Sequence, residues 1–502
     1  MPRLKSTEPA DAGANWTRAV AAGLLLALSA CSPGEEQPPL VSLVSPVRVS
    51  GATPFAAGCN GAPQSGAVHA GAEVEPSLAI DPLDPAHLVA AWQQDRWTNG
   101  GANGLLTAVS RDGGRTWTRG SAPFSRCTGG TAGNGGDYDR ATDPWLSFAA
   151  DGTMYQSALV FDDAHGRGRK AVLVSRSTDG GERWSAPVAL ASDSDPAFGL
   201  DKETVTADPG DALVVYAVWD RLTRQTDPDK TSATGPAWFA RSTDGGRSWE
   251  PARAIYDPGA DAQTISNQIV VLRDGTLVNL FVILLKASSE TPDGTIAILR
   301  SSDKGASWSQ PIPVAALLSV GTVDRKGGTA VRSGAVVPSI ALDPSTGALY
   351  VAWQDARFSS GARDGIALAH SADGGLTWSA PVQVNRAPAA QAFTPAVAVA
   401  KSGRVAVAYY DFRADDPNDS SRLLTSVWRA SSIDGGRTWN EVLLGGPFNL
   451  RDAPRAGGAF FLGDYVAQVG GGDDFTSLFV MSGSGSTGQT DVYAERSGVV
   501  VR

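Results

Sequence analysis

The sequence predicts an all-β fold built from one repeated structural unit. An eight-residue phrase recurs six times, and its tryptophan residues lie 59 to 70 residues apart. A period of this size indicates one supersecondary unit repeated around an axis. Glycine is abundant, with 57 residues, and short runs of Val, Ala and Leu alternate with Gly, Asp and Pro. Because this pattern favours strands joined by turns and shows almost no helical periodicity, we expect a ring of strand-rich units.

The clearest copy of the phrase is SADGGLTW, from Ser371 to Trp378. Its Ser and Asp side chains accept hydrogen bonds from nearby backbone N–H groups, its glycines permit positive φ, and its Trp adds a large apolar surface. Such a phrase predicts a tight turn between two antiparallel strands. The other copies span Ser110–Trp117, Ser177–Trp184, Ser242–Trp249, Ser301–Trp308 and Ser432–Trp439.

These six phrases resemble the Asp-box (BNR) repeat of the sialidase-like β-propellers, and the resemblance covers nearly the whole chain after the N-terminal segment. It implies a single β-propeller of four-stranded blades over residues 41–502. Because the phrase stabilises a turn in every unit, we expect it to be structural rather than ligand-binding.

Each unit is expected to be a four-stranded meander. In the first unit, the strands begin at Glu75, His87 and Gly104, and the fourth follows the phrase. A seventh copy begins near Phe461 but has no phrase and no fourth strand. The N-terminal segment Val41–Val49 reads as a strand and is predicted to supply the missing one. We therefore favour seven blades closed by this strand, with the six blades of the sialidase family as the alternative.

The N-terminus predicts export. Ala19–Ala30 is a 12-residue apolar run, the length of a signal-peptide core. It ends in Leu28-Ser29-Ala30-Cys31, which resembles the lipobox of bacterial lipoproteins and implies lipidation of Cys31. Residues 1–30 are then a signal peptide, residues 31–40 a tether, and the mature protein is lipid-anchored to the cell envelope. The alternative is a signal that is cleaved without lipidation or not cleaved.

The two remaining cysteines, Cys59 and Cys127, are an even pair in an oxidising compartment, so a disulfide is expected. Two free thiols are the alternative. The formal net charge of −10 argues against nucleic acid as a partner. The four histidines are too scattered for metal-ligand spacing, and no phosphate-binding loop is present, so we expect no metal and no cofactor. A monomer that contacts the membrane only through its lipid is expected.

The order of strands in a meander places the starts of the first strands and the ends of the second strands on one rim. Second strands end in Asp and Arg, at Arg96, Arg221 and Arg357. First strands begin near Glu75, Asp143 and Glu203. Either these side chains form structural Asp–Arg pairs, or the arginines converge to bind a carboxylate bidentately.

Sialidases hold the substrate carboxylate with three arginines, use an Asp as acid/base, and use a Tyr nucleophile activated by a Glu. By the resemblance, Arg96, Arg221 and Arg357 are predicted to bind substrate, and Asp143, Glu203 and Tyr465 to be catalytic. The chain order of the six residues matches the family, whereas the family's R-I-P motif is absent.

The resemblance therefore implies an exported glycoside hydrolase that removes a terminal acidic sugar such as sialic acid. A hydrolase with another glycan specificity is one alternative. The other is a non-catalytic propeller that binds glycan or protein in the cell envelope, because one fold hosts many functions.

Overall fold

The computed structural model describes residues 40–41, 45–61, 63–162, 168–223, 234–286, 293–483 and 488–497. The predicted signal peptide, Cys31 and nearly all of the predicted tether lie outside the described residues. Pro39–Arg502 forms one compact unit.

This unit is all-β, as the sequence predicts. Its described helices are three short 3-10 turns, η1 (Arg126–Thr128), η2 (Arg357–Ser359) and η3 (Leu450–Asp452). In the described part of the chain, no helix has the length and hydrophobicity needed to cross a membrane.

The strands form a β-propeller of antiparallel meanders, which we number in chain order. Unit 1 consists of β3 (Glu73–Ile80), β4 (Leu88–Arg96), β5 (Ala102–Ser110) and β6 (Thr118–Gly120). Unit 2 consists of β7 (Arg140–Phe148), β8 (Met154–Phe161), β9 (Lys170–Ser177) and β10 (Val188–Asp193). Unit 3 consists of β11 (Phe198–Ala207), β12 (Val215–Thr223), β14 (Ala237–Ser242) and β15 (Arg253–Tyr256).

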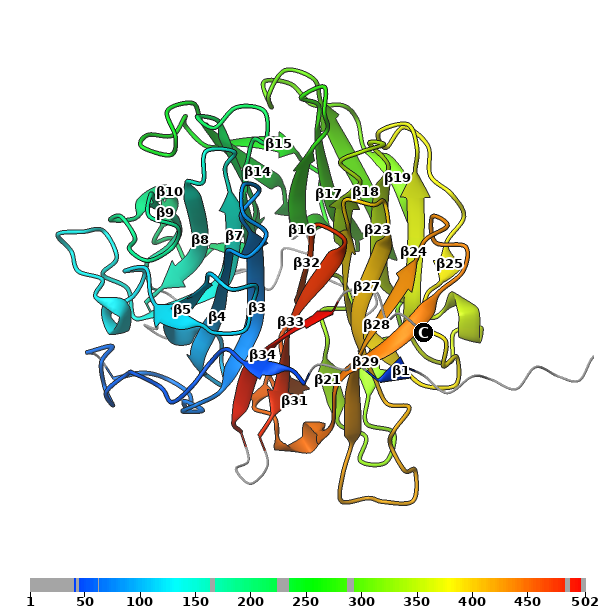
Figure 1. Ribbon diagram of the computed structural model, residues 1–502. Coiled ribbons are helices and arrows are strands. Elements are labelled where there is room, and N and C mark those ends of the chain that lie inside the picture. The colour runs from blue at the N-terminus through cyan, green and yellow to red at the C-terminus, as the bar shows by residue number, and fades with distance from the viewer. Residues whose placement is uncertain are drawn as a thin grey trace, which may run out of the picture. The chain divides into compact units, whose positions relative to one another are not determined.

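The remaining units continue the pattern around the molecule (Figure 1). Unit 4 consists of β16 (Ala262–Val271), β17 (Leu277–Leu285), β18 (Asp293–Ser301) and β19 (Ile312–Leu317), with β13 (Thr234–Gly235) added in parallel to β16. Unit 5 consists of β22 (Ser339–Leu342), β23 (Leu349–Asp355), β24 (Gly365–Ser371) and β25 (Val382–Gln383). Unit 6 consists of β26 (Ala392–Val399), β27 (Val405–Asp411), β28 (Leu424–Ser432) and β29 (Asn440–Asn449). Unit 7 consists of β32 (Ala467–Gly471), β33 (Asp474–Ser482) and β34 (Thr490–Ser497).

The predicted N-terminal strand Val41–Val49 is wrong as a single element. Leu40–Val41 (β1) pairs in parallel with β29 of unit 6, whereas Val47–Arg48 (β2) pairs antiparallel with β34 of unit 7. Pro46 immediately precedes β2, and proline has no N–H to donate to a strand ladder. The first strand of unit 7 also starts later than the sequence suggested, at Ala467 rather than near Phe461.

The recurring phrase forms the same hydrogen-bonded turn in all six copies. In the copy that follows β24, Ser371 Oγ donates to Asp373 (2.7 Å) and accepts from the Gly375 N–H (2.8 Å). The Thr377 N–H donates to the same carboxylate (2.9 Å), and the other five copies repeat these bonds. The turn therefore depends on residues within the phrase.

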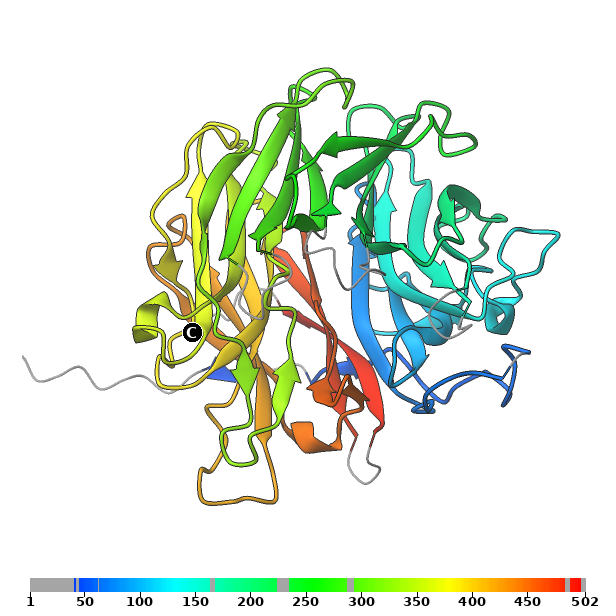
Figure 2. The same cartoon turned by 180° about the vertical axis from the view of Figure 1, so that it is seen from behind.

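The first strand of each unit packs beside that of the next along the chain, and β32 of unit 7 packs against β3 of unit 1. Figures 1 and 2 show these strands facing a common centre from both sides of the molecule. A hydrophobic cluster that includes Trp92 of unit 1, Tyr410 of unit 6 and Phe479 of unit 7 joins the two ends of the chain.

Two long connections meet in a small additional sheet, which we call the rim sheet. β20 (Thr322–Val323) and β21 (Ala330–Arg332) lie between units 4 and 5, whereas β30 (Arg455–Ala456) and β31 (Ala459–Phe461) lie between units 6 and 7. β21 and β31 pair in parallel, and both views show them side by side (Figures 1 and 2). The rim sheet thus links two segments about 130 residues apart in the sequence.

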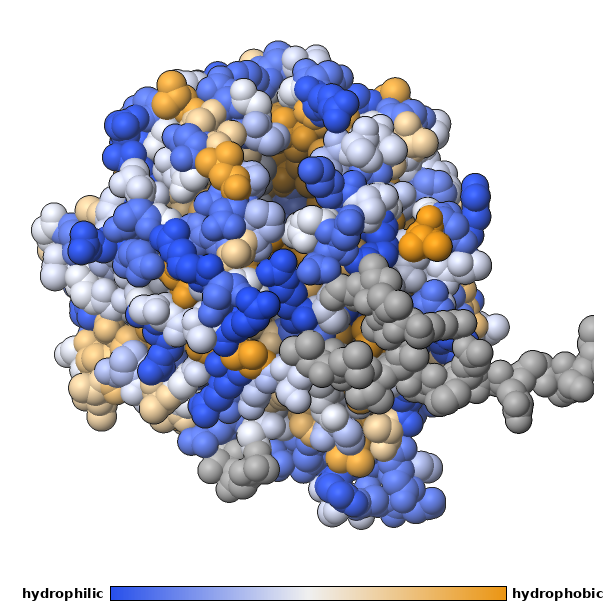
Figure 3. Space-filling view, in the orientation of Figure 1, coloured by the Kyte–Doolittle hydropathy of each residue, from blue (hydrophilic) through white to orange (hydrophobic). Residues whose placement is uncertain are grey.

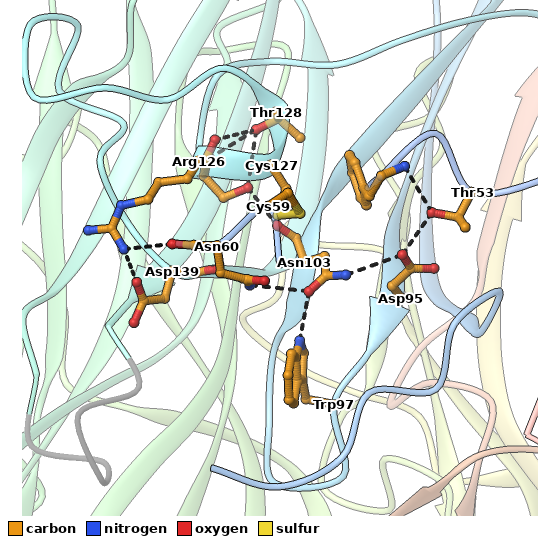
Figure 4. Close-up of a disulfide and its surroundings, with 12 residues drawn as sticks. Thr53, Cys59, Asn60, Asp95, Trp97, Asn103, Arg126, Cys127, Thr128 and Asp139 are labelled. Atoms are coloured by element: carbon orange, nitrogen blue, oxygen red, sulfur yellow. Dashed lines mark hydrogen bonds and ion pairs between the residues drawn. A yellow bond between two sulfur atoms is a disulfide. The ribbon is translucent and has the colours of Figure 1, made fainter. Parts of the chain in front are cut away.

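Cys59 and Cys127 form a disulfide that attaches the segment before unit 1 to the connection after it. Polar contacts surround the disulfide (Figure 4). Asn60 donates to Asn103 (3.2 Å) and to the Asp139 carbonyl (2.8 Å), and Trp97 donates to Asn103 (2.9 Å). These bonds hold the N-terminal segment beside the loops of units 1 and 2.

Candidate active site

The candidate site begins with a backbone irregularity that recurs in the first strands. The pairing of β3, β7 and β11 with their second strands slips once, and the residues in the slip, Glu75, Asp143 and Lys202, have positive φ of 53°, 53° and 49°. Non-glycine residues seldom adopt this conformation, and such strain is concentrated at functional sites. The three bulges direct a Glu, an Asp and a Lys side chain from adjacent units to one place.

Lys202 is the centre of this cluster. Its ammonium lies 3.4 Å from Glu75, 3.4 Å from Asp143 and 2.9 Å from Asp464, and all four side chains are buried. Asp464 also accepts a hydrogen bond from Arg332 Nε of the rim sheet (2.8 Å). Burial opposes the charge on Lys202, but the carboxylates of Asp143, Asp464 and Glu75 raise its pKa well above the ordinary value.

The carboxyl groups of this cluster hold their protons unequally. Burial raises the pKa of Glu75 to about 8 even though Lys202 opposes the shift. Burial also acts to raise the pKa of Asp143, but Lys202 and a hydrogen bond from Glu75 leave that pKa below its usual value. Lys202 and Arg332 likewise overcome burial and lower the pKa of Asp464. At neutral pH, Glu75 is therefore the protonated member and Asp143 and Asp464 are ionised.

A cavity of about 670 Å³ opens beside the cluster, within the range of small-molecule sites. Glu75, Asp143, Arg96, Asp201 and Arg332 line it. It therefore presents both carboxyl and guanidinium groups to a ligand.

Arg96 is a buried member of this lining. Its Nη1 donates to Gln93 (2.8 Å), whereas its buried Nε has no hydrogen-bond partner among the described residues. Its guanidinium lies 5.0 Å from the ring centre of Phe461, and the guanidinium of Arg332 lies 4.8 Å from the same ring. Phe461 of the rim sheet thus holds two arginines at one cavity through cation–π contacts.

Asp201 supplies a second carboxyl group with an altered proton affinity. It immediately precedes the bulge residue Lys202, and its side chain accepts from the Lys202 N–H (3.0 Å). Burial of its carboxyl group raises its pKa to about 6, with Lys202 opposing the shift and Asp143 adding to it. The cavity therefore contains two carboxyl groups, Glu75 and Asp201, whose pKa values lie on either side of neutrality.

The structure brings four of the six sequence-predicted site residues to this region. Asp143 and Arg96 line the cavity, whereas Glu203 and Tyr465 are buried and do not line it. Tyr465 donates to the Pro144 carbonyl (3.3 Å), and burial raises its pKa well above the ordinary value. Burial and Asp143 also raise the pKa of Glu203 well above the ordinary value, and both of its oxygens lack partners among the described residues. The Tyr465 phenol therefore keeps its proton at neutral pH.

Arg221 and Arg357 are not in the lining of this cavity. Arg221 donates to Asp193 (3.0 Å) and stacks on Phe198 at 3.8 Å, whereas Arg357 donates twice to Asp355 (2.8 Å each). Each guanidinium is occupied within its own unit or the neighbouring one. Their expected convergence with Arg96 on one carboxylate does not occur in this structure, because neither side chain lines the cavity that Arg96 lines.

Sequence reasoning missed Lys202 and Arg332 and gave no role to Asp201. Lys202 lies next to the predicted Glu203, so a one-residue bulge decides which side chain faces the cluster. Arg332 lies in a connection that no repeat pattern covers. The available signal for Lys202 was a basic residue between two acidic ones, Asp201 and Glu203, at the start of a first strand.

Residues 237–461 match a family model described as a BNR repeat-like domain. The match covers 225 of the chain's 502 residues. The resemblance to the BNR-repeat propellers predicted from the recurring phrases is confirmed by this match. The segment runs from β14 to β31 and so includes the rim sheet that carries Arg332 and Phe461. No curated protein matches the chain at a significant level.

Several solved structures also resemble the chain. A Hadza microbial sialidase is 17% identical, with 82% of this chain and 73% of the sialidase covered and a TM-score of 0.47. An α-L-arabinanase from Penicillium chrysogenum is 12% identical, with 90% and 98% covered and a TM-score of 0.46. A leech intramolecular trans-sialidase is 13% identical, with 85% and 92% covered and a TM-score of 0.43.

Proposed function

We propose that this protein is a glycoside hydrolase that acts in the cavity beside Lys202. The observation that carries the proposal is the placement of two carboxyl groups in one cavity, Glu75 with a pKa of about 8 and Asp201 with a pKa of about 6. Titratable groups whose environments separate their pKa values are suited to the roles of acid and base. The BNR repeat-like domain is consistent with a glycan substrate.

In the proposed reaction, Glu75 donates its proton to the glycosidic oxygen as the bond to the anomeric carbon breaks. Asp201, ionised, takes a proton from the water molecule that attacks that carbon. Asp143 accepts the hydrogen bond from Glu75 and Lys202 neutralises the carboxylates around it, so both orient the acid. The buried Tyr465 hydroxyl is bonded to a backbone carbonyl, and the proposal gives it no role as nucleophile.

The substrate we propose carries an acidic group on its sugar. Arg96 and Arg332 both lie against Phe461, and both line the cavity. Guanidinium groups bind carboxylates strongly and directionally. A terminal acidic sugar, such as sialic acid, fits this pair, with Arg332 in the place that the sequence had given to Arg221 and Arg357.

The test is hydrolysis of a panel of fluorogenic glycosides, including a sialoside and uronides, by wild type and by Glu75→Gln. Loss of a general acid is expected to lower kcat by about 100-fold or more, with little change in melting temperature. Glu250→Gln, at a half-exposed pair with Arg241, is the matched control and should keep full activity. Absence of hydrolysis across the whole panel would reject catalysis and favour the non-catalytic, glycan-binding alternative.

We also infer that units 1 to 7 are the blades of one closed, seven-bladed ring. The pairing of β2 with β34 supports this inference, because it gives unit 7 a fourth strand from the other end of the chain. The packing of β32 against β3 supports it as well. Propellers need such a closure to satisfy the edges of their terminal blades.

For location, we propose export and a lipid anchor at Cys31. The proposal rests on the apolar run Ala19–Ala30 and the lipobox-like sequence that follows it. The Cys59–Cys127 disulfide supports it, since such bonds persist in oxidising compartments. Cys31→Ala is expected to move the protein from the membrane fraction to the soluble fraction. An equally membrane-bound variant, with no lipid on wild type by mass spectrometry, would contradict the proposal.

A further inference from the structure

The first described strand shows where the chain enters the propeller. β1 pairs in parallel with β29, and Leu40 lies opposite Val442. Val442 lies two residues after Asn440, where β29 begins directly after the recurring turn of unit 6. Because β1 runs in the same direction as β29, its N-terminal end points toward that turn. The chain therefore enters the propeller at the end of unit 6 that carries the recurring turn.

We call this end of the molecule the turn rim. It is formed by the recurring turns that begin at Ser110, Ser177, Ser242, Ser301, Ser371 and Ser432. In unit 6, Val405 at the start of β27 pairs with Ser432, whereas Asp411 at its end pairs with Ser426. The corresponding end of β4 carries Arg96, which lines the proposed catalytic cavity. A strand of nine residues, such as β4, is about 30 Å long, so roughly this distance separates the turn rim from the cavity.

The proposed lipid anchor lies close in the sequence to the point of entry. Cys31 precedes Leu40 by nine positions, and a segment of this length spans at most about 30 Å when fully extended. A lipid on Cys31 therefore keeps the turn rim near the bilayer. A bilayer at the cavity end would require nearly full extension of the segment along the side of the propeller, which costs conformational entropy.

The recurring turn that precedes β29 carries a large apolar side chain. Its second residue is Ile433, which is 86% exposed. The other five copies have polar or small residues at this position: Arg111, Thr178, Thr243, Ser302 and Ala372. Hydrophobic side chains form only small separate patches on the face shown in Figure 3, so exposure alone does not identify a contact surface. Ile433 is distinctive because it replaces a polar or small residue in the copy where the chain enters.

We infer that the turn rim faces the lipid bilayer and that Ile433 contacts it, so that the catalytic cavity lies at the end away from the membrane. Contact with lipid removes the apolar Ile433 side chain from water. This inference rests on the proposed anchor and hydrolase and deepens both, because it names the substrate class. The substrates are glycans that are soluble or extend from another surface, rather than glycolipids of the membrane that holds the enzyme.

The first experiment locates the two ends of the molecule relative to a bilayer. Ile433→Cys and Val320→Cys each receive an environment-sensitive fluorophore in the acylated full-length protein, which is reconstituted in vesicles with nitroxide-labelled head groups. Labelling without reductant leaves the disulfide intact. Val320 is the comparison because it is 56% exposed and lines a neighbouring cavity that shares Asp201 and Arg332 with the catalytic one. We expect a blue shift and loss of fluorescence for the label at position 433, and neither for the label at position 320.

The second experiment tests the substrate class. The vesicle-bound wild type is given the preferred sugar of the fluorogenic panel either on a soluble oligosaccharide or on a glycolipid in the same vesicles. We expect the glycolipid to be hydrolysed at least about tenfold more slowly, because the geometry prevents the anchor and the cavity from engaging one bilayer together. Dispersal of the same glycolipid and protein in detergent removes this constraint and should restore hydrolysis.

Stronger quenching at position 320 than at position 433, or equal quenching at both, would overturn the inference. Hydrolysis of the glycolipid as fast as the soluble glycan, at a rate that does not fall when the vesicles are diluted, would overturn it as well. If wild type carries no lipid, the anchor proposal fails and this inference fails with it, whereas the hydrolase is still judged by the glycoside panel. If no glycoside is hydrolysed but the quenching follows the expected pattern, the proposed hydrolase fails while the orientation stands.

Discussion

Glu75 differs from the other carboxyl groups of the cluster because it holds a proton at neutral pH. It accepts hydrogen bonds from Gln93 and from the Asp464 N–H, and it lies 3.4 Å from the Lys202 ammonium. Burial raises the pKa of Glu75, Asp143 and Asp464 add to the shift, and Lys202 and Arg96 do not offset it, so the proton stays on Glu75. A protonated carboxyl group in the cavity wall can donate its proton to a substrate bound there.

The first prediction is a bell-shaped pH dependence of kcat/KM. Activity should rise as Asp201 ionises, with a limb near pH 6, and fall as Glu75 loses its proton, with a limb near pH 8. The measurement is kcat/KM from pH 4.5 to 9.5 on the best substrate of the panel. Asp201→Asn should lower the rate and remove the acidic limb. An acidic limb that persists in Asp201→Asn would show that another group is the base.

The second prediction compares Arg96, which lines the cavity, with Arg221, which does not. Arg96→Lys keeps the charge but loses the planar guanidinium, so kcat/KM should fall at least about tenfold. Arg221→Lys should leave kcat/KM unchanged and lower the melting temperature slightly, because Arg221 pairs with Asp193 and stacks on Phe198. Thermal melts of both variants accompany the kinetics. Equal kinetic losses at the two positions would contradict the placement of the substrate beside Arg96.

At the scale of the element, the recurring turns lie at the end of each unit away from the cavity. In the pairing of β4 with β5, Arg96 lies opposite Ala102, whereas Ser110, the start of the phrase, lies opposite Leu88. The phrase and the cavity are therefore separated by the length of the strands. This placement follows from strand order alone, which is why it was predictable from the sequence.

The third prediction concerns the turn in unit 5. Trp378 packs against a hydrophobic cluster of units 4 and 5 and donates to the Gly375 carbonyl (3.2 Å). Trp378→Ala is expected to cost about 2 to 3 kcal/mol of stability, somewhat less than for a fully buried tryptophan. Turnover per folded molecule should not change. Leu376→Ser, at an exposed position in the same turn, is the control and should match wild type in denaturant titrations. A selective loss of activity in Trp378→Ala would place the turn near the substrate.

The site was less predictable than the turns for a physical reason. Turn formation depends on residues within eight positions, so local chemistry reveals it. The slipped pairing in β3, β7 and β11 changes which side chain faces the centre. No residue type in the sequence predicts where such a bulge occurs. Thus Glu203 was expected at the site, whereas Lys202 occupies it. Arg332 reaches the cavity only because β21 pairs with β31, a contact between distant segments.

At the scale of the whole molecule, the seam between the two ends of the chain combines backbone pairing with a buried acid. The Val49 N–H donates to the Val492 carbonyl (2.8 Å), next to the pairing of β2 with β34. Glu73 of β3 is buried against β34, where it accepts from the Val492 N–H (3.2 Å). Ser50, Asp491, Arg48 and Tyr493 are further polar groups that interact with it.

The fourth prediction is that Glu73 makes the seam sensitive to high pH. Burial raises its pKa to about 8; Ser50 opposes the shift, Asp491 adds to it, and Arg48 opposes it. The folded-state pKa of Glu73 lies above the unfolded one, near 4.5, so the unfolded chain gives up this proton at a lower pH than the folded protein does. The contribution of Glu73 to the free energy of unfolding is therefore fully present below about pH 4.5 and is lost as pH rises through 8. The loss is at most about 5 kcal/mol at pH 9, at 1.36 kcal/mol per pKa unit.

Glu73→Gln cannot ionise, so its melting temperature should fall less than that of wild type between pH 5 and pH 9. Glu250→Gln, at an exposed pair, should follow the wild-type curve. Parallel curves for Glu73→Gln and wild type would mean that Glu73 ionises without cost in the folded protein, and the seam would then owe its stability to the β2–β34 pairing and its apolar contacts.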